Sequence, residues 1–421
     1  MPADDQRSRL EDFLGDDTVG SISQDVLKKS HPLVVGPRQA LQETWIPPRL
    51  VHRDREIRQV INIMAPAYRG DAPSNMLIYG KTGTGKTAVV TRVLDDLRKK
   101  VPEEARLKPV FVNCRDADTD YSVLRELVNA TQDPTLKPVG EKSGTHATLL
   151  RLRQAMQKND GLAIVVLDEV DRLVKRSGDN ALYSLMELNT HLKNGHVSLI
   201  GISNDLQFIE DLESRVQSRL NEQSVVFHPY TQDQLRDILR DRAKAVLVQG
   251  ALEDGVIEHC ATAAARDHGD ARRAIALFRT AVQLAEKEGA RQVTDVHVVK
   301  AISELELNVI GEGVRTLPVQ QKILLWTLLA EYRVKKKPLS SGAVYDSFAR
   351  ICQNLGIPTA SVRTVSNYLS ELEVLGIIRA DLVYRGRASG RTREITPTVP
   401  VGPTLKLVKD SEDLLSDLKD F

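Results

Sequence analysis

The chain has 421 residues and a formal net charge of +1, and 27% of its residues are charged while 41% are hydrophobic. This length is enough for about three domains of ordinary size, and this composition is that of a folded protein rather than a disordered one. Three widely spaced cysteines, Cys114, Cys260 and Cys352, argue against a disulfide framework or a zinc site and fit a reducing cytoplasm. Apolar runs such as 162–167 are too short to cross a bilayer and no secretory signal begins the chain, so we expect no membrane partner.

The small net charge hides an asymmetry along the chain. Residues 315–400 hold thirteen Lys and Arg residues against six Asp and Glu residues, a net charge of +7 that leaves −6 for the rest. A basic C-terminal module on an otherwise acidic protein indicates that this module binds a polyanion.

The first 40 residues are predicted to form a flexible acidic tail, because seven Asp and Glu residues fall among the first 25. Within this tail, Leu10, Phe13 and Leu14 could form one face of a short helix that binds a partner such as a sliding clamp. An ordinary solvated tail is the alternative interpretation.

The segment Trp45–Arg53 differs from the tail before it. Pro47 and Pro48 force an extended path, and the segment leads into a predicted helix that contains Ile57, Val60, Ile61 and Met64. If the strand that follows leads to a nucleotide, this apolar segment, which includes Val51, is well placed to form a wall beside an adenine ring.

The pattern G-x-x-x-x-G-K-[ST] occupies residues 80–87, between a strand-like run and a helix-forming run. The backbone N–H groups of such a loop point at phosphate from the positive end of a helix. Lys86 can contact the β- and γ-phosphates, and the Thr87 hydroxyl can hold Mg²⁺. A glycine-rich turn without a ligand would not need Lys and Thr after its last glycine, so we predict a site for ATP or ADP with Mg²⁺. The loop residues expected to bind phosphate are Gly80, Gly83, Thr84 and Gly85.

Two predicted strands end in polar side chains. The apolar run 162–167 is followed at once by Asp168 and Glu169, and the run 197–203 is followed by Asn204. Asp168 can orient the Mg²⁺ shell, Glu169 can polarise an attacking water, and Asn204 could contact the γ-phosphate or that water. A strand end capped by acids is the alternative, but the presence of a phosphate loop in the same chain argues against it.

Strands and helices alternate through the rest of this region. Residues 110–114 are predicted to form a second buried strand, and helices are predicted on both sides of the loop Pro134–Thr145. Arg215 and Arg219 lie on a helix end or turn. This alternation is typical of a parallel α/β sheet with right-handed crossovers. Residues 231–310 then change to helical spacing throughout, and Arg272, at the start of one of these helices, could swing over bound phosphates.

The last module, residues 316–400, is predicted to be a winged helix with three helices and a hairpin whose strands lie near 377–383 and 393–396. The apolar residues of its third helix are expected to be buried: Val362, Val365, Leu369, Leu372 and Leu375. The polar residues on its outward N-terminal half are expected to meet base edges, as in helix-turn-helix proteins: Ser361, Arg363, Thr364 and Asn367.

The predicted hairpin tip carries Arg385, Arg387 and Arg391 among glycines, with no acidic residue. Such arginines suit phosphates or a narrow minor groove. A winged helix that binds protein rather than DNA is the alternative, since the fold supports both uses.

Together these features resemble an AAA+ ATPase of the archaeal family related to the eukaryotic origin-recognition and cell-division-control replication initiators. The resemblance covers most of residues 40–395. The matching segments are Trp45–Glu56, residues 80–87, Asp168-Glu169, Asn204, Phe227–Tyr230, Gly269–Ala274 and the C-terminal module.

The resemblance implies roles for individual residues. Glu169 is the catalytic acid, Asn204 the first sensor and Arg272 the second sensor. Tyr230 and Arg242 match positions near the nucleotide at the junction of base and lid.

Arg215 matches the arginine finger, which acts on the ATP of a neighbouring subunit, although an ordinary surface salt bridge is the alternative. The loop Pro134–Thr145 matches the inserted element that distinguishes initiators from other AAA+ proteins.

The fold that the resemblance implies is an α/β AAA+ core with a parallel sheet, an all-helical lid and a C-terminal winged-helix domain. The predicted boundaries are a tail at 1–40, the AAA+ base at 41–229, the lid at 230–312, the winged helix at 313–400 and a flexible tail at 401–421.

The implied function is that of an ATP-dependent replication initiator. It would bind double-stranded origin DNA, recruit or load the replicative helicase, and use slow ATP hydrolysis as a switch. A second initiator subunit is a further expected partner, and the expected location is the cytoplasm, with the nucleoid. The alternatives are a clamp loader or branch-migration motor, and a nucleotide-bound transcription regulator that does not hydrolyse ATP.

Overall fold

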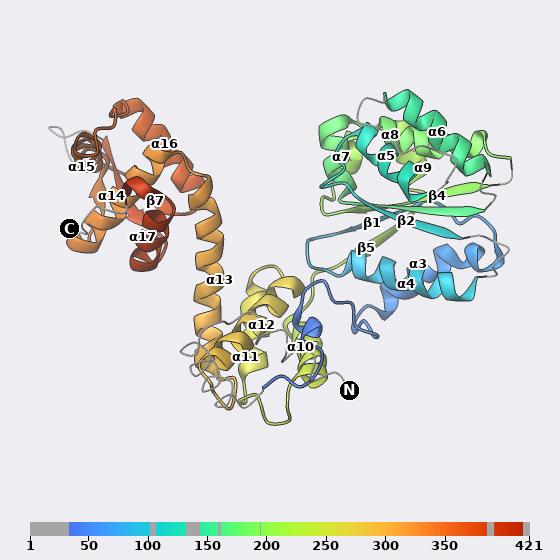
Figure 1. The fold of residues 1–421 in the computed structure, drawn as a ribbon, viewed down its shortest axis with the longest axis horizontal. Helices are drawn as coiled ribbons and strands as arrows, with labels where there is room; N and C mark the ends of the chain where they lie inside the picture. The colour runs from blue at the N-terminus through green and yellow to red at the C-terminus, as the bar shows by residue number, and fades with distance from the viewer. Residues whose placement is uncertain are drawn as a thin grey trace, which may run out of the picture. The chain divides into compact units, whose positions relative to one another are not determined.

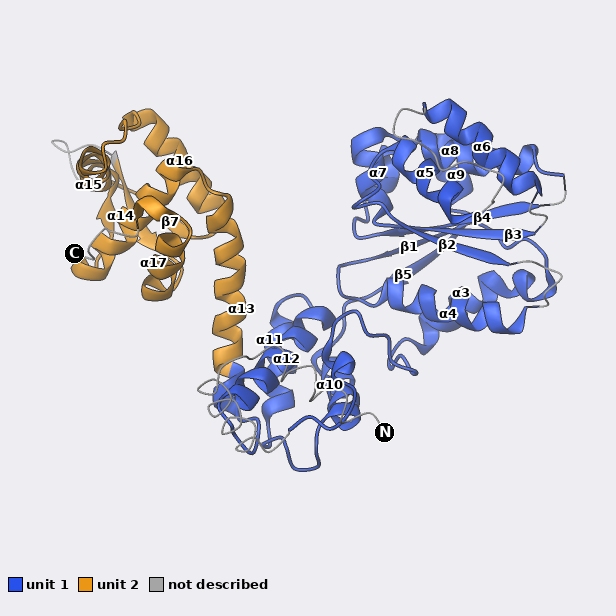
Figure 2. Cartoon of the chain, viewed as in Figure 1, with its two compact units in different colours: residues 1–298 blue, residues 299–421 orange. Residues whose placement is uncertain are grey.

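The computed structural model divides the chain into two compact units, residues 1–298 and residues 299–421 (Figure 2). None of the helices in the described residues is both long and apolar enough to cross a membrane. The described residues are 33–101, 107–131, 144–158, 161–193, 195–384 and 391–415.

A parallel β-sheet forms the centre of the first unit, with the strand order β2-β3-β4-β1-β5. The strands β3 and β4 are buried along nearly their whole length, as expected where helices cover both faces of a sheet. The predicted parallel α/β core is therefore confirmed. The strands are β1 (Met76–Gly80), β2 (Lys108–Asn113), β3 (Leu162–Asp168), β4 (His196–Ser203) and β5 (Gln223–Phe227).

The two edge strands depart from the predictions. We expected a buried strand at 110–114, but β2 lies at the edge of the sheet and Phe111 is exposed. We did not predict β5, in which only Val225 and Phe227 are buried. An edge strand has one neighbour and a partly solvated face, so it lacks the continuous apolar run that identifies a central strand.

Helices cover both faces of the sheet (Figure 1). One face packs against α3 (Asp54–Met64) and α4 (Lys86–Lys100), with η2 (Ala65–Arg69) beside them. The other face carries α5 (Asp120–Ala130), α6 (Thr145–Lys158), α7 (Val170–Ser177), α8 (Asn180–Glu187) and α9 (Ser214–Leu220), with the short helices η4 (Leu188–Thr190) and η5 (Phe208–Asp211).

The strand register brings three parts of the chain to one edge of the sheet. β1 ends at Gly80, β3 at Asp168 and β4 at Ser203, with Tyr79 paired to Ser203 and Asp168 paired to Ile202. Ligands of open α/β sheets bind outside the carboxyl ends of the strands. The phosphate loop and the polar residues after β3 and β4 therefore meet at the edge where a ligand is expected.

The predicted helical lid is formed by α10 (Gln232–Val246), α11 (Val256–Arg266), α12 (Ala271–Lys287) and the start of α13 (Asp295–Thr316). The segment 33–45 packs on it and contains η1 (Arg38–Leu41). The N–H groups of Val35 and Gly36 donate to the carbonyl of Val246, at 2.9 and 3.0 Å.

The prediction of a flexible tail is therefore wrong for residues 33–40. Leu33 and Leu41 are buried against the lid, and Arg38 forms two hydrogen bonds with Glu286. The preceding residues 1–32, including the apolar side chains proposed to bind a clamp, lie outside the described residues.

The second unit contains the predicted winged helix. Its helices are α14 (Val319–Lys335), α15 (Ser341–Asn354) and α16 (Val362–Val374), and an antiparallel sheet has the order β6-β8-β7. The sheet consists of β6 (Leu339–Ser340), β7 (Ile378–Tyr384) and β8 (Arg391–Pro397). Helix α13 runs on into this unit, so the break between units, after residue 298, falls inside a helix and before the boundary predicted at residue 312.

Two of the residues predicted to be buried on the third helix are exposed. Val362 is 64% exposed and Leu375 is 49% exposed, whereas Val365, Leu369 and Leu372 are buried. Val362 lies in the first turn of α16 and Leu375 caps its end, so the apolar stripe is in contact with the core only along the middle of the helix.

The predicted flexible tail after residue 400 is also wrong as far as residue 415. Residues Val401–Asp410 form α17, followed by η6 (Asp413–Leu415). Leu405, Val408 and Leu415 are buried in the core of the second unit. The spacing of Leu405 and Val408 places both on one face of the helix.

Replacing Leu405 by Ala should lower the free energy of unfolding of the second unit by about 2–5 kcal/mol, because the change removes buried methyl groups and leaves a cavity. Lys406→Ala, at the neighbouring exposed position, should change it by less than about 0.5 kcal/mol. Denaturant unfolding followed by Trp326 fluorescence, with Trp45 replaced by Phe, measures both effects. Equal unfolding midpoints for the two variants would mean that α17 does not belong to the core.

Candidate functional site

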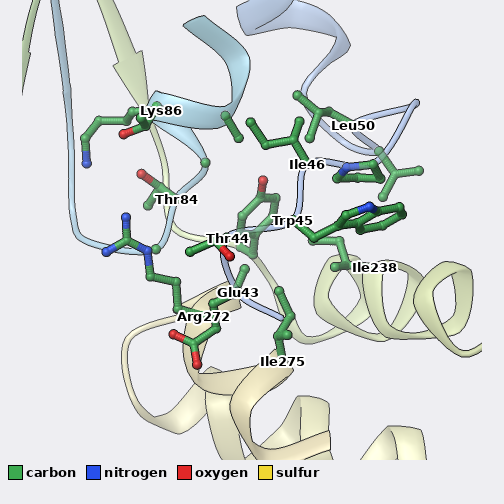
Figure 3. Close-up of a pocket in the computed structure, with 18 of the residues that line it drawn as sticks. Glu43, Thr44, Trp45, Ile46, Leu50, Thr84, Lys86, Ile238, Arg272 and Ile275 are labelled. Carbon is green, nitrogen blue, oxygen red and sulfur yellow. The ribbon is translucent and has the colours of Figure 1, made fainter. Parts of the chain in front are cut away.

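A cavity of about 690 Å³ opens at the carboxyl edge of the sheet. It is lined by the extended segment 43–51, the phosphate loop, the ends of β3 and β4, and the lid helices α10 and α12. Figure 3 shows a polar end, with Thr84, Lys86 and Arg272, and an apolar end that includes Trp45 and Leu50. A cavity with phosphate-binding groups at one end and apolar walls at the other fits a nucleoside polyphosphate.

The phosphate loop needs glycine at two positions. Gly83 and Gly85 have φ angles of 73° and 87°, in the left-handed region that side chains disfavour. A Cβ atom at Gly83 would lie 1.6 Å from the Asp270 carboxylate, and one at Gly85 would lie 2.8 Å from the Tyr230 hydroxyl. The loop therefore packs directly against residues that follow the sheet, and it has no room for a side chain at either position.

Lys86 is buried at the polar end of the cavity. Its Nζ donates hydrogen bonds to the carbonyls of Gly80 at 2.6 Å and Lys81 at 2.9 Å, and to Oδ1 of Asn204 at 2.8 Å. Burial lowers the pKa of Lys86 to about 8, although the nearby Asp168 carboxylate opposes this shift. Lys86, predicted to contact the β- and γ-phosphates, is thus in direct contact with Asn204, predicted to contact the γ-phosphate or the attacking water.

The predicted magnesium ligands also lie together. The Thr87 hydroxyl donates to Oδ2 of Asp168 at 2.9 Å, and Oδ1 of Asp168 accepts the N–H of Glu169 at 3.0 Å. Among the described residues, no group of three or more His, Cys, Asp or Glu side chains could hold a metal. A hydroxyl and one carboxylate beside a phosphate loop fit Mg²⁺, which binds through few protein ligands together with phosphates.

Glu169 is held in an unusual conformation at the start of α7. Its φ angle is 56°, a left-handed value that costs a non-glycine residue energy and often marks a functional site. Its carboxylate forms an ion pair with Arg172 at 2.6 Å, and it lines the cavity beside Asp168. This position suits the predicted role of Glu169 toward a water molecule.

Arg272 reaches the polar end of the cavity from the lid. It lies in the first turn of α12, where Oδ1 of Asp270 accepts its N–H at 2.7 Å, and the N–H of Ala271 donates to the carbonyl of Gly83 at 3.2 Å. The start of α12 is therefore bonded to the phosphate loop. The Arg272 side chain points toward the Thr84 and Lys86 side of the cavity (Figure 3).

The apolar end is formed mainly by the segment that precedes the sheet. Trp45, Leu50 and Val51 line it from that segment, and Ile238 and Ile275 line it from the lid. The apolar segment predicted to form a wall beside an adenine ring therefore lines the cavity together with lid residues, and its contact with adenine stays a prediction.

Arg53 is a buried residue of this site that we did not predict. Its guanidinium lies 3.8 Å from the ring centroid of Tyr230, and it donates to Glu56 at 2.9 Å and to the carbonyl of His228 at 2.7 Å. It thereby fixes Tyr230, which lines the cavity. His228 and Tyr230 lie about 175 residues away from Arg53, so spacing along the chain carries no sign of this role.

Arg242 lines the cavity and also holds the segment 40–45. It donates to the carbonyls of Ala40 at 2.6 Å, Gln42 at 2.8 Å and Trp45 at 3.0 Å. Burial lowers its pKa to about 10. These bonds stabilise the apolar wall, while direct contact of Arg242 with a nucleotide stays a prediction.

Arg215 lies on α9 and does not line the cavity. It pairs with Glu213 at 2.6 Å and stacks on the Tyr183 ring at 4.1 Å from its centroid, and about half of its side chain is exposed. The structure thus separates Arg215 from the site of its own chain, and its role toward a neighbouring subunit stays a prediction.

The N-terminal half of α16 presents the residues predicted to read DNA. Ser361, Arg363 and Asn367 are exposed, and the Ser361 side chain caps the helix by accepting the N–H of Thr364 at 3.2 Å. Arg385, Arg387 and the side chain of Arg391 lie outside the described residues, as does most of the loop Pro134–Thr145.

Comparison with known families identifies three parts of the chain. The family model described as an AAA domain matches residues 69–210. The model described as a Cdc6 AAA+ ATPase-type lid domain matches residues 236–303, and that of the CDC6 C-terminal winged helix domain matches residues 312–405.

Relatives match nearly the whole chain. An ORC1-type DNA replication protein of Pyrococcus abyssi is 42% identical over 85% of this chain and 86% of its own length. ORC1-type DNA replication protein 1 of Methanosarcina acetivorans is 39% identical over 91% of this chain and 92% of its own length.

Two solved structures share the fold. The Aeropyrum pernix ORC1 protein, solved in complex with DNA, has a TM-score of 0.74 at 37% identity and covers 92% of this chain and 99% of its own. Cdc6p of Pyrobaculum aerophilum has a TM-score of 0.58 at 20% identity over 92% of this chain and all of its own, which supports the fold alone.

The lowered pKa of Lys86 predicts a pH dependence of nucleotide binding. Bound phosphates favour the charged ammonium, so above about pH 8 the free protein must take up a proton to bind. The dissociation constant of Mg-ADP should therefore rise by up to about tenfold per pH unit above pH 8. Calorimetry in two buffers of different ionisation enthalpy should detect proton uptake at about pH 9 and little at pH 7, since phosphate itself titrates near pH 6. Binding without proton uptake at pH 9 would contradict the contact between Lys86 and phosphate.

Proposed function

Because the chain belongs to the family of ORC1-type DNA replication proteins, we propose that it is an ATP-dependent replication initiator. In this role it binds double-stranded origin DNA and helps to recruit or load the replicative helicase. The observation that carries this proposal is the likeness, at 37% identity over 92% of the chain, to an ORC1 protein solved with DNA. The helicase step rests on family membership alone.

The arrangement around the cavity supports ATP as the nucleotide. Lys86 and the loop N–H groups would hold the phosphates, while Thr87 and Asp168 would hold Mg²⁺, which neutralises phosphate charge. Glu169 would accept a proton from an attacking water, and Asn204 would orient that water or the γ-phosphate. Arg272 would contact the phosphates from the lid, so that ATP and ADP are distinguished by both halves of the cavity.

Glu169→Gln should leave the dissociation constant of Mg-ATP within about threefold of the wild-type value and reduce hydrolysis by at least about 100-fold, because only the proton acceptor is lost. Glu306→Gln, a change of the same kind at an exposed position of α13, should alter neither quantity. Equilibrium binding and single-turnover hydrolysis measure the two effects. Hydrolysis at the wild-type rate by Glu169→Gln would remove Glu169 from the mechanism.

A second subunit of this chain or a related initiator would complete the catalytic set. Arg215 is half exposed on α9 and away from its own cavity, which suits a finger that reaches a neighbour's γ-phosphate.

A sliding clamp stays a weaker proposal, because the residues that suggest it lie outside the described residues. A cytoplasmic location on the nucleoid follows from the proposed DNA partner.

The winged helix supports the proposed DNA contact. The exposed N-terminal half of α16 presents Arg363 and Asn367, side chains that make paired hydrogen bonds with guanine and adenine edges. The arginines of the hairpin tip would add phosphate or minor-groove contacts.

Mapping of the chromosomal sites that the protein occupies tests the proposed function. An initiator should occupy one or a few intergenic repeat clusters, whereas a transcription regulator would occupy many promoters.

Arg363→Ala should weaken binding to an occupied site by about 1–3 kcal/mol and binding to random DNA far less.

The matched control for this variant is Lys406→Ala, which removes a charge from the same module at an exposed position of α17. It should keep the wild-type preference for the occupied site. An equal loss on both kinds of DNA for Arg363→Ala would mean that α16 does not read bases.

A further inference from the structure

A buried carboxylate beside the cavity has no role in the mechanism proposed above. Asp171 lies in the first turn of α7, two residues after Glu169, and is buried. It does not line the cavity, so it is not placed to touch a nucleotide. A buried carboxylate is costly unless hydrogen bonds satisfy it, and its partners therefore indicate what it holds in place.

The partners of Asp171 lie at the end of β4. Its Oδ1 accepts hydrogen bonds from the Ser203 hydroxyl at 3.1 Å and from the N–H of Asn204 at 3.3 Å. The Ser203 hydroxyl also lies 2.8 Å from the carbonyl of Asp205 and accepts the N–H of Asp205 at 2.9 Å. The single hydroxyl proton is thus shared between Asp171 and Asp205, and the carboxylate is the stronger acceptor.

A second bond joins the same helix to the same turn. Lys175, one helical turn after Asp171, forms an ion pair with Asp205 at 2.6 Å. This pair is partly exposed and therefore weaker than a buried contact. Helix α7 is bonded to the turn 203–205 at both ends of that turn, and Asp171 makes the buried bonds.

This contact connects the two groups expected to act on the attacking water. Glu169 immediately precedes α7 as its N-cap residue, and the Asn204 side chain accepts a hydrogen bond from Lys86. Because Asp171 bonds to the backbone of Asn204, it fixes the position of that side chain relative to both Glu169 and Lys86.

We propose that Asp171 is a positioning residue for Asn204, which it holds through the Ser203 hydroxyl and the Asn204 N–H, and that it sets the rate of ATP hydrolysis rather than nucleotide affinity. The effect on hydrolysis rests on the proposed ATPase function. The structural part does not, because the bonds join protein atoms alone.

An effect of the Asp171 charge on Lys86 is the competing explanation, since the two side chains interact electrostatically. The two explanations predict different behaviour for Asp171→Asn. This variant removes the charge and keeps an oxygen acceptor for both bonds. Asp171→Ala removes both.

The experiment compares Asp171→Ala and Asp171→Asn in the full chain. Asp171→Ala should lower kcat by about 10- to 100-fold, the usual effect of displacing a positioned group, and leave the dissociation constant of Mg-ATP within about threefold. Asp171→Asn should recover most of kcat. Asp233→Ala, a change in the first turn of α10 at an exposed position, is the matched control and should behave as wild type.

Backbone hydrogen exchange supplies a readout that does not depend on activity. In the nucleotide-free full chain, residues 203–205 should exchange faster in Asp171→Ala than in wild type, and Asp171→Asn should remain close to wild type. If Asp171→Ala does not fold, Ser203→Ala removes one of the two bonds from the other side and should give a smaller change in the same direction.

Unchanged exchange and unchanged kcat in Asp171→Ala would overturn the proposal. A loss of nucleotide affinity shared by the Ala and Asn variants would overturn it as well, in favour of the effect of charge on Lys86. If the wild-type protein binds Mg-ATP without hydrolysing it, the proposed ATPase function fails, and faster exchange at 203–205 in Asp171→Ala still supports the positioning of Asn204.

Discussion

The site depends on holding a lysine ammonium group among oxygen atoms away from water. Lys86 is bonded to two carbonyls of its own loop and to Asn204 at the end of a different strand, and burial holds its pKa near 8. A buried ammonium is tolerated only where acceptors surround it, so the loop and the end of β4 must both be in place around it. Charged phosphate oxygens are stronger acceptors than carbonyls. An anionic ligand therefore stabilises the charged state that burial disfavours in the free protein.

The same loop joins the base to the lid. The absence of a side chain at Gly83 admits the Asp270 carboxylate, which caps α12 by accepting the N–H of Arg272. The N–H of Ala271 in turn donates to the carbonyl of Gly83. The glycine thus serves two functions, since it lets the loop turn around phosphate and lets a lid helix begin against that loop. A nucleotide that rearranges the loop would directly change the contacts between the loop and the start of α12.

The sequence predicted those parts of the site whose functional residues are neighbours along the chain. Residues 80–87 and Asp168-Glu169 are short motifs that end apolar strands, and the parallel sheet then brings them to one edge. The segment 33–45 could not be predicted, because Arg242 holds it through backbone carbonyls some 200 residues away, and carbonyl acceptors leave no pattern in a sequence. Helix α17 was missed although its apolar spacing is regular. Proline is tolerated in the first turn of a helix, so Pro400 and Pro403 do not prevent α17 from forming.

The cavity is therefore held from two sides by two short networks of the same kind. In the base, Asp171 of α7 fixes the turn that carries Asn204; in the lid, Asp270 fixes the start of α12 that carries Arg272. Each network places one polar side chain at the phosphate end of the cavity, and neither acidic residue needs to touch the ligand. A ligand that contacts both the base and the lid is held by both networks. Its binding free energy stabilises the arrangement in which the two networks face each other, because a ligand stabilises the state that binds it. Under the proposed function, the presence or absence of the γ-phosphate would then change how the lid is held through two hydrogen-bonded turns, without any change in the sheet that supports them.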